Sequence, residues 1–274
     1  MISSIVTQLG NHTNTPLEED LVRHIVLNTI RSLKTKFSEY GELVIACDDK
    51  NYWRRSIFPY YKGNRKKDRE KSDIDWSSLF NNLNKIKQEL KDNFPYRVVQ
   101  VLGAEADDVI ATLCENYGEI LNTPLGEKIM ILSGDKDFIQ LHKYSNVSQY
   151  DPVHKKQIND KDPIKYLEEL ILKGDRGDGI PNVLSPDNCL VDGLRQKPLT
   201  AKKIKEFLED GVSKDIYMNY IRNKNLIDFS SIPEELQTAI MEEYASQSYK
   251  GRDKLFNYFV QHKLKNLMEH ISEF

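Results

Sequence analysis

The segment RVVQVLGAEADD, residues 97–108, joins a run of apolar residues to a group of carboxylates. A valine-rich run that ends at a glycine is typical of a buried strand, so residues 97–102 are expected to form one. Glu105, Asp107 and Asp108 then stand at the start of a helix that is expected to reach about residue 117. The segment therefore predicts a strand whose carboxyl end places acidic side chains at the edge of a sheet.

Two more segments repeat this order of a short apolar strand followed by aspartate. Residues 42–47 (ELVIAC) lead to Asp48, and residues 128–132 (KIMIL) lead to Asp135 and Asp137. One helix, opened by a capping box at 15–18, is expected before the first of these strands, and another, over about 74–92, is expected between two strands. Strands that alternate with helices predict an α/β fold with a parallel sheet and helices on both faces.

The pattern changes beyond about residue 160, where only helices are expected. One begins at Asp162-Pro163 and ends at a glycine-rich turn, GDRGDGIPNV at residues 174–183. Further helices are expected near residues 200–222, 233–245 and 253–271. We therefore divide the chain into an α/β domain, residues 1–160, and a helical portion, residues 161–274.

Composition favours a globular protein of the cytoplasm. The chain has 274 residues, of which 39% are hydrophobic and 30% charged, and it lacks the run of roughly 18 apolar residues that spans a membrane. Its three cysteines form no CxxC pair, which argues for reduced thiols and against a zinc site. We expect a monomer without a membrane partner, in the cytoplasm, or in the host cytoplasm if a phage encodes it.

The net charge of −3 conceals a basic segment at about residues 52–72. Aromatic residues alternate with cations in YWRR (52–55) and YYK (60–62), a mixture that can stack bases while it neutralises phosphates. Lys62 and Arg54 are expected nearest the scissile phosphate, where they would stabilise developing charge. The other residues of this segment that we expect to contact nucleic acid are Trp53, Arg55, Arg65, Lys66 and Lys67.

Carboxylates at the ends of parallel strands meet at one edge of the sheet and repel one another unless a cation neutralises them. Hard divalent ions with oxygen ligands, Mg²⁺ or Mn²⁺, suit such a site, and two ions about 4 Å apart can catalyse phosphodiester hydrolysis. One aspartate after a strand is equally typical of a helix N-cap. Three groups together, EADD (105–108), DKD (135–137) and DRGD (175–178), predict a metal centre.

The motifs, in their order and spacing, resemble those of the flap-endonuclease and 5′–3′ exonuclease family, most closely its tailed-phage members. They are CDD (47–49), YWRR (52–55), YYKGNR (60–65), EADD (105–108), GDKDFIQLHKY (134–144) and ILKGDRGDGIPNV (171–183). The resemblance implies a PIN-like domain that cleaves 5′ flaps and removes RNA or DNA from 5′ ends with two Mg²⁺ ions, as in RNase H-type primer removal. It also implies branched DNA and RNA–DNA hybrids as substrates, and a single-strand-binding protein and a sliding clamp as partners.

The resemblance also assigns roles to residues by their position. Arg54, Tyr61 and Lys62 fall on the arch that meets the scissile phosphate and the 5′ strand. Residues 174–183 fall on a helix-two-turn-helix that grips duplex backbone, commonly with a K⁺ ion. Metal ligation is assigned to Asp48, Glu105, Asp107, Asp108, Asp135, Asp137, Asp175 and Asp178, and contact with DNA to Gly177, Gly179, Ile180 and Asn182.

The amino-terminal sequence departs from the family pattern. Family members begin with a central strand that ends in a metal-ligating aspartate, whereas this sequence starts Met1-Ile2-Ser3-Ser4 and its first acidic residue is Glu18. We therefore expect the first central strand to be missing, which would open a groove in the sheet and remove apolar burial. Either a longer protein exists, or the chain lacks one strand and one ligand.

A second departure follows the glycine-rich turn. A loop at residues 184–199 replaces the second glycine turn of many relatives and leads to Thr200-Ala201-Lys202-Lys203, so Lys202 and Lys203 are expected to contact phosphates. Two functions stay open. The first is a Mg²⁺-dependent 5′ nuclease, and the alternative is a DNA-binding member of the family with a crippled metal site.

Overall fold

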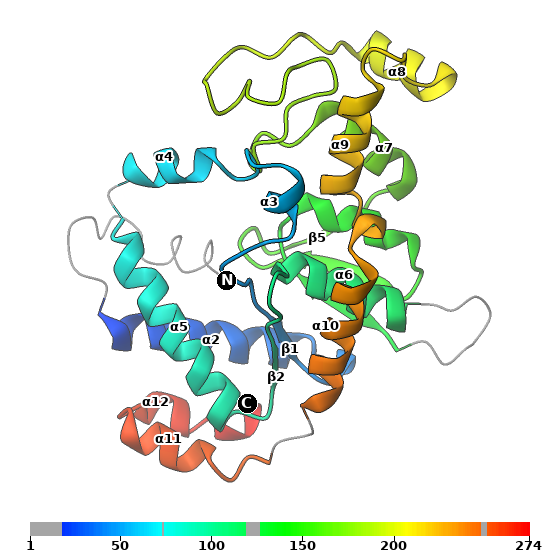
Figure 1. The fold of residues 1–274 in the computed structure, drawn as a ribbon. Coiled ribbons are helices and arrows are strands. Elements are labelled where there is room, and N and C mark those ends of the chain that lie inside the picture. The colour runs from blue at the N-terminus through cyan, green and yellow to red at the C-terminus, as the bar shows by residue number, and fades with distance from the viewer. Residues whose placement is uncertain (1–17, 73, 119–126, 248–250) are drawn as a thin grey trace.

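A computed structural model describes residues 18–72, 74–118, 127–247 and 251–274 (Figure 1). The amino-terminal part of the expected capping box, residues 15–17, lies outside the described residues. In chain order, with η for a 3-10 helix, the elements are α2 (Glu19–Lys36), η1 (Ser38–Tyr40), β1 (Val44–Ala46), α3 (Arg54–Ile57), α4 (Asn64–Glu70), α5 (Trp76–Asn93), β2 (Arg97–Val99), α6 (Ala106–Tyr117), β3 (Ile129–Leu132), η2 (Lys136–Lys143), β4 (Val147–Asp151), β5 (Lys156–Ile158), α7 (Pro163–Lys173), α8 (Ala201–Asp210), α9 (Tyr217–Ile227), η3 (Phe229–Ser231), α10 (Glu234–Ser246), α11 (Leu255–Gln261), α12 (Lys265–Met268) and η4 (Ile271–Glu273).

The strands confirm the α/β class. β1 pairs with β2 in parallel, and β3 pairs with β4 in parallel, while β5 adds an antiparallel edge to β4. Side chains alternate across β2: Val98 joins the core formed with α2 and α5, whereas Val99 packs with Val109 of α6 and Ile240 of α10. Helices therefore cover both faces of the β1–β2 pair, as Figure 1 shows with α5 on one side and α10 on the other.

Some expected element bounds were wrong. The strand expected over residues 97–102 ends at Val99, because the chain turns at Gly103 (φ 86°), and Leu102 is 80% exposed. The single helix expected over 200–222 is divided at Gly211, whose φ of 82° ends α8. The helix expected over 253–271 is divided near Lys263, which also has a positive φ.

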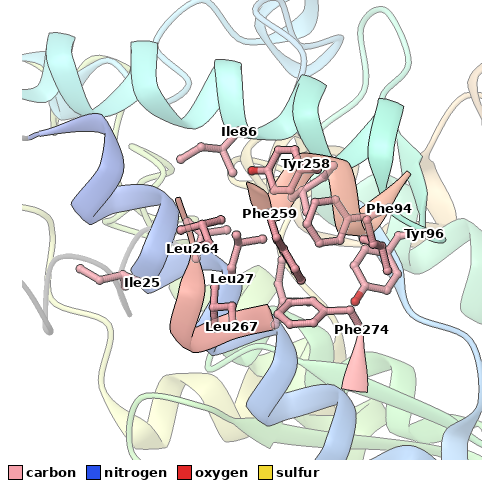
Figure 2. Close-up of a cluster of buried hydrophobic side chains, with 14 of the residues drawn as sticks. Ile25, Leu27, Ile86, Phe94, Tyr96, Tyr258, Phe259, Leu264, Leu267 and Phe274 are labelled. Atoms are coloured by element: carbon pink, nitrogen blue, oxygen red, sulfur yellow. The ribbon is translucent and has the colours of Figure 1, made fainter. Parts of the chain in front are cut away.

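The largest core cluster joins the amino-terminal half of the chain to its last residue (Figure 2). The rings of Phe94, Phe259 and Phe274 pack edge to face with one another, with centroid distances of 5.2 to 6.0 Å. Helices α11 and α12 thus pack on α2 and α5, and α10 packs on α6 and β2. The helices after α9 therefore return to the α/β domain, and the division near residue 160 stays a prediction.

A cavity of about 460 Å³ separates the two sheets. It is lined by the edge residues of β1 and β3, by Ile30 and Leu33 of α2, and by Ile110 and Leu113 of α6. Within the described part of the chain, no strand joins β1 to β3. A groove therefore lies between the described strands β1 and β3, and the absence of a central strand stays a prediction, because residues 1–17 lie outside the described residues. None of the described helices is long and apolar enough to cross a membrane.

Candidate metal centre and nucleic-acid interface

The predicted acidic residues come from four places in the fold. Asp48 follows β1, the EADD group (105–108) opens α6, the DKD group (135–137) follows β3, and the DRGD group (175–178) follows α7. The carboxylate of Asp48 accepts a hydrogen bond from the backbone N–H of Ala106 at 2.8 Å, which joins the end of β1 to the start of α6. The carboxyl ends of β1 and β3, the start of α6 and the turn after α7 thus carry these side chains.

The electrostatics show that the carboxylates of this edge act on one another. Burial and the negative charge of Asp135 raise the pKa of Asp107 to about 7. Burial together with Asp135 and Asp175 raises the pKa of Asp137 to about 8. The pKa of Asp175 is also raised, by burial and by the neighbouring Asp178. Negative charge at this edge is therefore only partly compensated by the protein.

Basic side chains compensate some of the acidic residues directly. The Arg54 guanidinium, which is only 2% exposed, lies 3.0 Å from Glu105 and 2.7 Å from Asp108. Lys62 forms an ion pair with Glu105 and lies 3.6 Å from Asp178. Arg54 also donates to the backbone carbonyl of Leu226 at 2.8 Å, so its guanidinium is held inside the protein. In this arrangement Arg54 neutralises the start of α6.

Tyr61 and Arg65 complete this network. The Tyr61 hydroxyl lies 2.9 Å from a carboxylate oxygen of Glu105 and 2.9 Å from one of Asp178. Burial raises the pKa of Tyr61, so the hydroxyl stays protonated and acts as a donor. Arg65 lies 2.5 Å from Asp178. The basic segment, the start of α6 and the turn after α7 are thus linked by side chains from all three.

The remaining acidic residues form no ion pair with a basic side chain in the part of the chain that the structure describes: Asp48, Asp107, Asp135, Asp137 and Asp175. All five keep some solvent exposure, and all their donor atoms are oxygens. This charge and this chemistry fit hard divalent cations. As the side chains lie, no three described carboxylate, histidine or cysteine groups are close enough to hold one metal ion.

Two buried glutamines, which the sequence analysis did not single out, hold the backbone of the DKD group. Gln149 donates to the carbonyl of Asp135 at 2.5 Å and to that of Ser133 at 2.9 Å. Gln140 donates to the carbonyl of Asp137 at 2.9 Å. Each stands in a mostly apolar stretch, FIQL (138–141) and VSQY (147–150), and a lone glutamine in such a stretch is the signal that could have found them.

The basic segment presents fewer free side chains than its sequence indicates. Trp53 is half-buried and donates from its indole nitrogen to Asp108 at 3.1 Å. Arg55 is exposed and its guanidinium lies 4.9 Å from the centroid of the Tyr52 ring. The side chains of Lys66 and Lys67 lie outside the described part of the structure. Arg55 is therefore the predicted DNA contact of this segment that most clearly faces solvent.

The glycine-rich turn packs directly on the basic segment. The backbone N–H of Lys62 donates to the carbonyl of Asp178 at 2.7 Å. Gly179, at φ 75°, lies so close to the carbonyl of Tyr60 that a Cβ there would stand 3.0 Å from it. This close approach and the positive φ both require glycine. The turn therefore sets the position of Lys62 relative to the acidic residues.

Other predicted DNA contacts in the helical portion differ in exposure. Gly177 is exposed, whereas Ile180 is 2% exposed and Asn182 is 7% exposed, so these two side chains support the turn from inside. Lys202 and Lys203 lie in the first turn of α8, both exposed, and Lys202 stands 3.8 Å from Glu206. Their contact with DNA stays a prediction.

Comparison with known proteins places the chain in a family. Residues 7–169 match the family described as 5′–3′ exonuclease, N-terminal resolvase-like domain, and residues 164–274 match the family described as T4 RNase H, C terminal. The chain belongs to the 5′–3′ exonuclease family. The resemblance seen in the motifs is thereby confirmed, together with the resolvase-like α/β fold.

Particular relatives are phage and bacterial nucleases. Ribonuclease H of Enterobacteria phage T4 is 35% identical over 269 residues, which cover 93% of this chain and 87% of the relative. A 5′–3′ exonuclease of Buchnera aphidicola (subsp. Schizaphis graminum) is 31% identical over 58% of this chain and 53% of its own. The flap endonuclease of bacteriophage T5, solved in complex with DNA and metal ions, shares the fold, with a TM-score of 0.59 and 17% identity over 88% of this chain and 94% of its own.

Proposed function

We propose that this chain is a divalent-metal-dependent 5′ nuclease that acts on 5′ flaps, other 5′-ended DNA and RNA–DNA hybrids during DNA replication. The observation that supports the proposal most strongly is the set of five aspartates without a basic partner (Asp48, Asp107, Asp135, Asp137 and Asp175) beside a basic segment that carries Lys62. Its relatives are a ribonuclease H, 5′–3′ exonucleases and flap endonucleases, which supports the same activity.

The five aspartates would hold two Mg²⁺ ions, with Mn²⁺ as a substitute. When bound, these ions would supply charge neutralisation and Lewis acidity at the scissile phosphate. Burial and repulsion from neighbouring carboxylates raise the pKa of Asp107 and of Asp137. A bound cation would offset this repulsion and lower both pKa values. Glu105, Asp108 and Asp178, which basic side chains already neutralise, would orient the site around these ligands.

The basic residues would have different roles in binding the substrate. Lys62 is buried beside Glu105 and Asp178, and it would exchange its contact with Glu105 for the scissile phosphate, whose developing charge it would stabilise. Arg54 would act through Glu105 and Asp108, because its guanidinium is buried against both. Arg55 and Arg65 would contact the 5′ strand.

The helical portion would hold duplex beside the cut site. The turn at residues 174–183 would contact the backbone of the duplex with Gly177 and Gly179, and a K⁺ ion would bind there. A single-strand-binding protein and a sliding clamp are the partners that we propose from the family. The chain would work as a monomer in the cytoplasm, or in that of a host if a phage encodes it.

Cleavage of a labelled 5′-flap duplex tests the proposal. With Mg²⁺ the intact chain should cut near the base of the flap, and with EDTA it should not. Asp135→Asn should abolish cutting, whereas Asp228→Asn, a control at the start of η3, should cut like wild type. Mg²⁺-independent cutting, or equal cutting by Asp135→Asn, would refute the metal role.

A DNA-binding protein with a crippled metal site is the second candidate. It is favoured by the absence, among the described residues, of three ligands close enough to hold an ion, and by the open groove between β1 and β3. Tight, Mg²⁺-independent binding of the flap duplex without any cutting by wild type would support this candidate over the nuclease.

A further inference from the structure

Helix α9 contacts both the glycine-rich turn and the residues around the acidic side chains. Figure 1 shows α9 beside α7, and the two helices pack against each other. One face of α9 carries residues at the spacing of successive helical turns: Asn219, Arg222, Asn223, Leu226 and Ile227. Each of these five supplies a side chain or a backbone carbonyl to another segment of the site. The helix therefore joins two parts of the site that are far apart in sequence.

The middle of α9 is hydrogen-bonded to the end of α7 and to the glycine-rich turn. Asn223, which is fully buried, donates from its side-chain amide to the carbonyls of Ile171 at 2.8 Å and Pro181 at 3.0 Å. Its side-chain oxygen accepts from Nε of Arg222 at 2.9 Å, and Arg222 also donates to the carbonyl of Pro181. Both ends of the Asn223 amide are thus occupied, and its donors hold the turn.

The carboxyl end of α9 is hydrogen-bonded to side chains that surround the acidic residues. The last carbonyls of a helix have no partner within the helix. Here the carbonyl of Leu226 accepts from Arg54 at 2.8 Å, and that of Ile227 accepts from the buried side chain of Gln140 at 3.1 Å. The same nitrogen of Gln140 donates to the carbonyl of Asp137. The end of α9 is therefore bonded to the cation that neutralises the start of α6 and to the glutamine that holds the DKD group.

The helix itself sets the distance between these two groups of contacts. A helix rises about 1.5 Å per residue, so Asn223 and Ile227 are about 6 Å apart along its axis. The side chains of Leu226 and Ile227 also belong to the apolar cluster that contains Tyr61 and Ile180. Hydrogen bonds and apolar contacts thus both oppose movement of the turn relative to the acidic residues.

We propose that Asn223 is a positioning residue that fixes the glycine-rich turn relative to the metal centre, through α9, and so determines which phosphodiester is cut. The proposal rests on the proposed nuclease function, in which the turn holds the duplex. Successive phosphates of one strand lie about 3.4 Å apart along a duplex. A turn that moved relative to the metal centre would present a neighbouring phosphate or misplace the correct one, and a misplacement of about 1 Å can slow a reaction about a hundredfold.

The initial products from an end-labelled 5′-flap duplex, separated at single-nucleotide resolution, test this role. Wild type should cut mainly at one phosphodiester. Asn223→Ala should spread the products over neighbouring phosphodiesters and lower the single-turnover rate at least about tenfold. Asn219→Ala, which removes bonds from a half-buried side chain to the carbonyls of Val183 and Ser185, should spread the products less. Asn225→Ala, a control at an exposed asparagine of the same helix, should give the wild-type pattern.

The product pattern separates positioning from stability, because unfolded protein lowers the amount of product without moving the cut. Asn219→Ala keeps the test decisive if Asn223→Ala does not fold. A wild-type product pattern in Asn219→Ala, or in folded Asn223→Ala, would overturn the positioning role and leave the nuclease standing. Absence of cutting by wild type would refute both the proposed function and this role.

Discussion

The side-chain nitrogen of Gln149, a fully buried residue of strand β4, lies 2.5 Å from the carbonyl oxygen of Asp135, to which it donates a hydrogen bond. The same amide reaches the carbonyl of Ser133 at 2.9 Å, and its oxygen lies 3.0 Å from Nε2 of His142. Both ends of the amide are therefore occupied, and the backbone that carries Asp135 is tied to the neighbouring strand. Gln149 is a positioning residue for the proposed metal centre.

Gln149→Leu should weaken metal use as well as stability. Loss of the two hydrogen bonds to these carbonyls and of the contact with His142 should lower the free energy of unfolding by about 2–4 kcal/mol. Because the Asp135 loop is freed, the Mg²⁺ concentration for half-maximal cleavage should rise. Gln237→Leu, which removes a bond from another glutamine to the carbonyl of Ile232, should leave the Mg²⁺ requirement unchanged. Equal Mg²⁺ curves for both variants would contradict the positioning role.

Arg54→Ala should destabilise the protein far more than Arg55→Ala. Removal of the buried guanidinium leaves Asp108 without its ion-pair partner and Glu105 with Lys62 alone, which should cost about 3–5 kcal/mol. The exposed Arg55 next to it should change the free energy of unfolding by about 0.5 kcal/mol or less. Urea denaturation measures both variants. Similar midpoints would show that Arg54 is not needed to neutralise the start of α6.

Acid should remove part of the stability that Glu89 provides. Burial alone would raise the pKa of Glu89, but hydrogen bonds from Arg23 and Tyr258 hold it below 4.5. A carboxyl with a lowered pKa contributes stability above its ordinary pKa, and this contribution is lost as pH falls through the folded value. The stability difference between wild type and Glu89→Gln should therefore be constant near pH 6–7 and shrink below pH 4.5. A difference that does not vary with pH would contradict this linkage.

The cavity between the sheets should be visible in hydrogen exchange. The backbone N–H of Cys47 donates to Val99 of β2, so by alternation along the strand the N–H of Ala46 points to the cavity side. In the described part of the chain no strand pairs with that edge. The Ala46 amide should therefore exchange at least about tenfold faster than that of Cys47. Equal protection of both amides would mean that a backbone partner occupies the cavity.

The sequence predicted the elements that place the acidic residues, because each short apolar run is followed by aspartate, and these runs are β1, β2 and β3. The β4–β5 hairpin was not predicted, because VSQYD (147–151) alternates weakly and carries the buried Gln149. Burial of Arg54 was also missed. A cation in a basic segment looks exposed until the fold brings Asp108, 54 positions away, against it.

Counting bound Mn²⁺ by electron paramagnetic resonance tests the metal centre most directly. Wild type should bind two ions, and Asp107→Asn should bind fewer and more weakly, because it removes one of the five aspartates without a basic partner. Asp228→Asn, whose carboxylate only caps η3, should bind like wild type. If wild type binds no Mn²⁺, or if Asp107→Asn binds as many ions with the same affinity, the acidic residues do not form the metal centre of a 5′ nuclease.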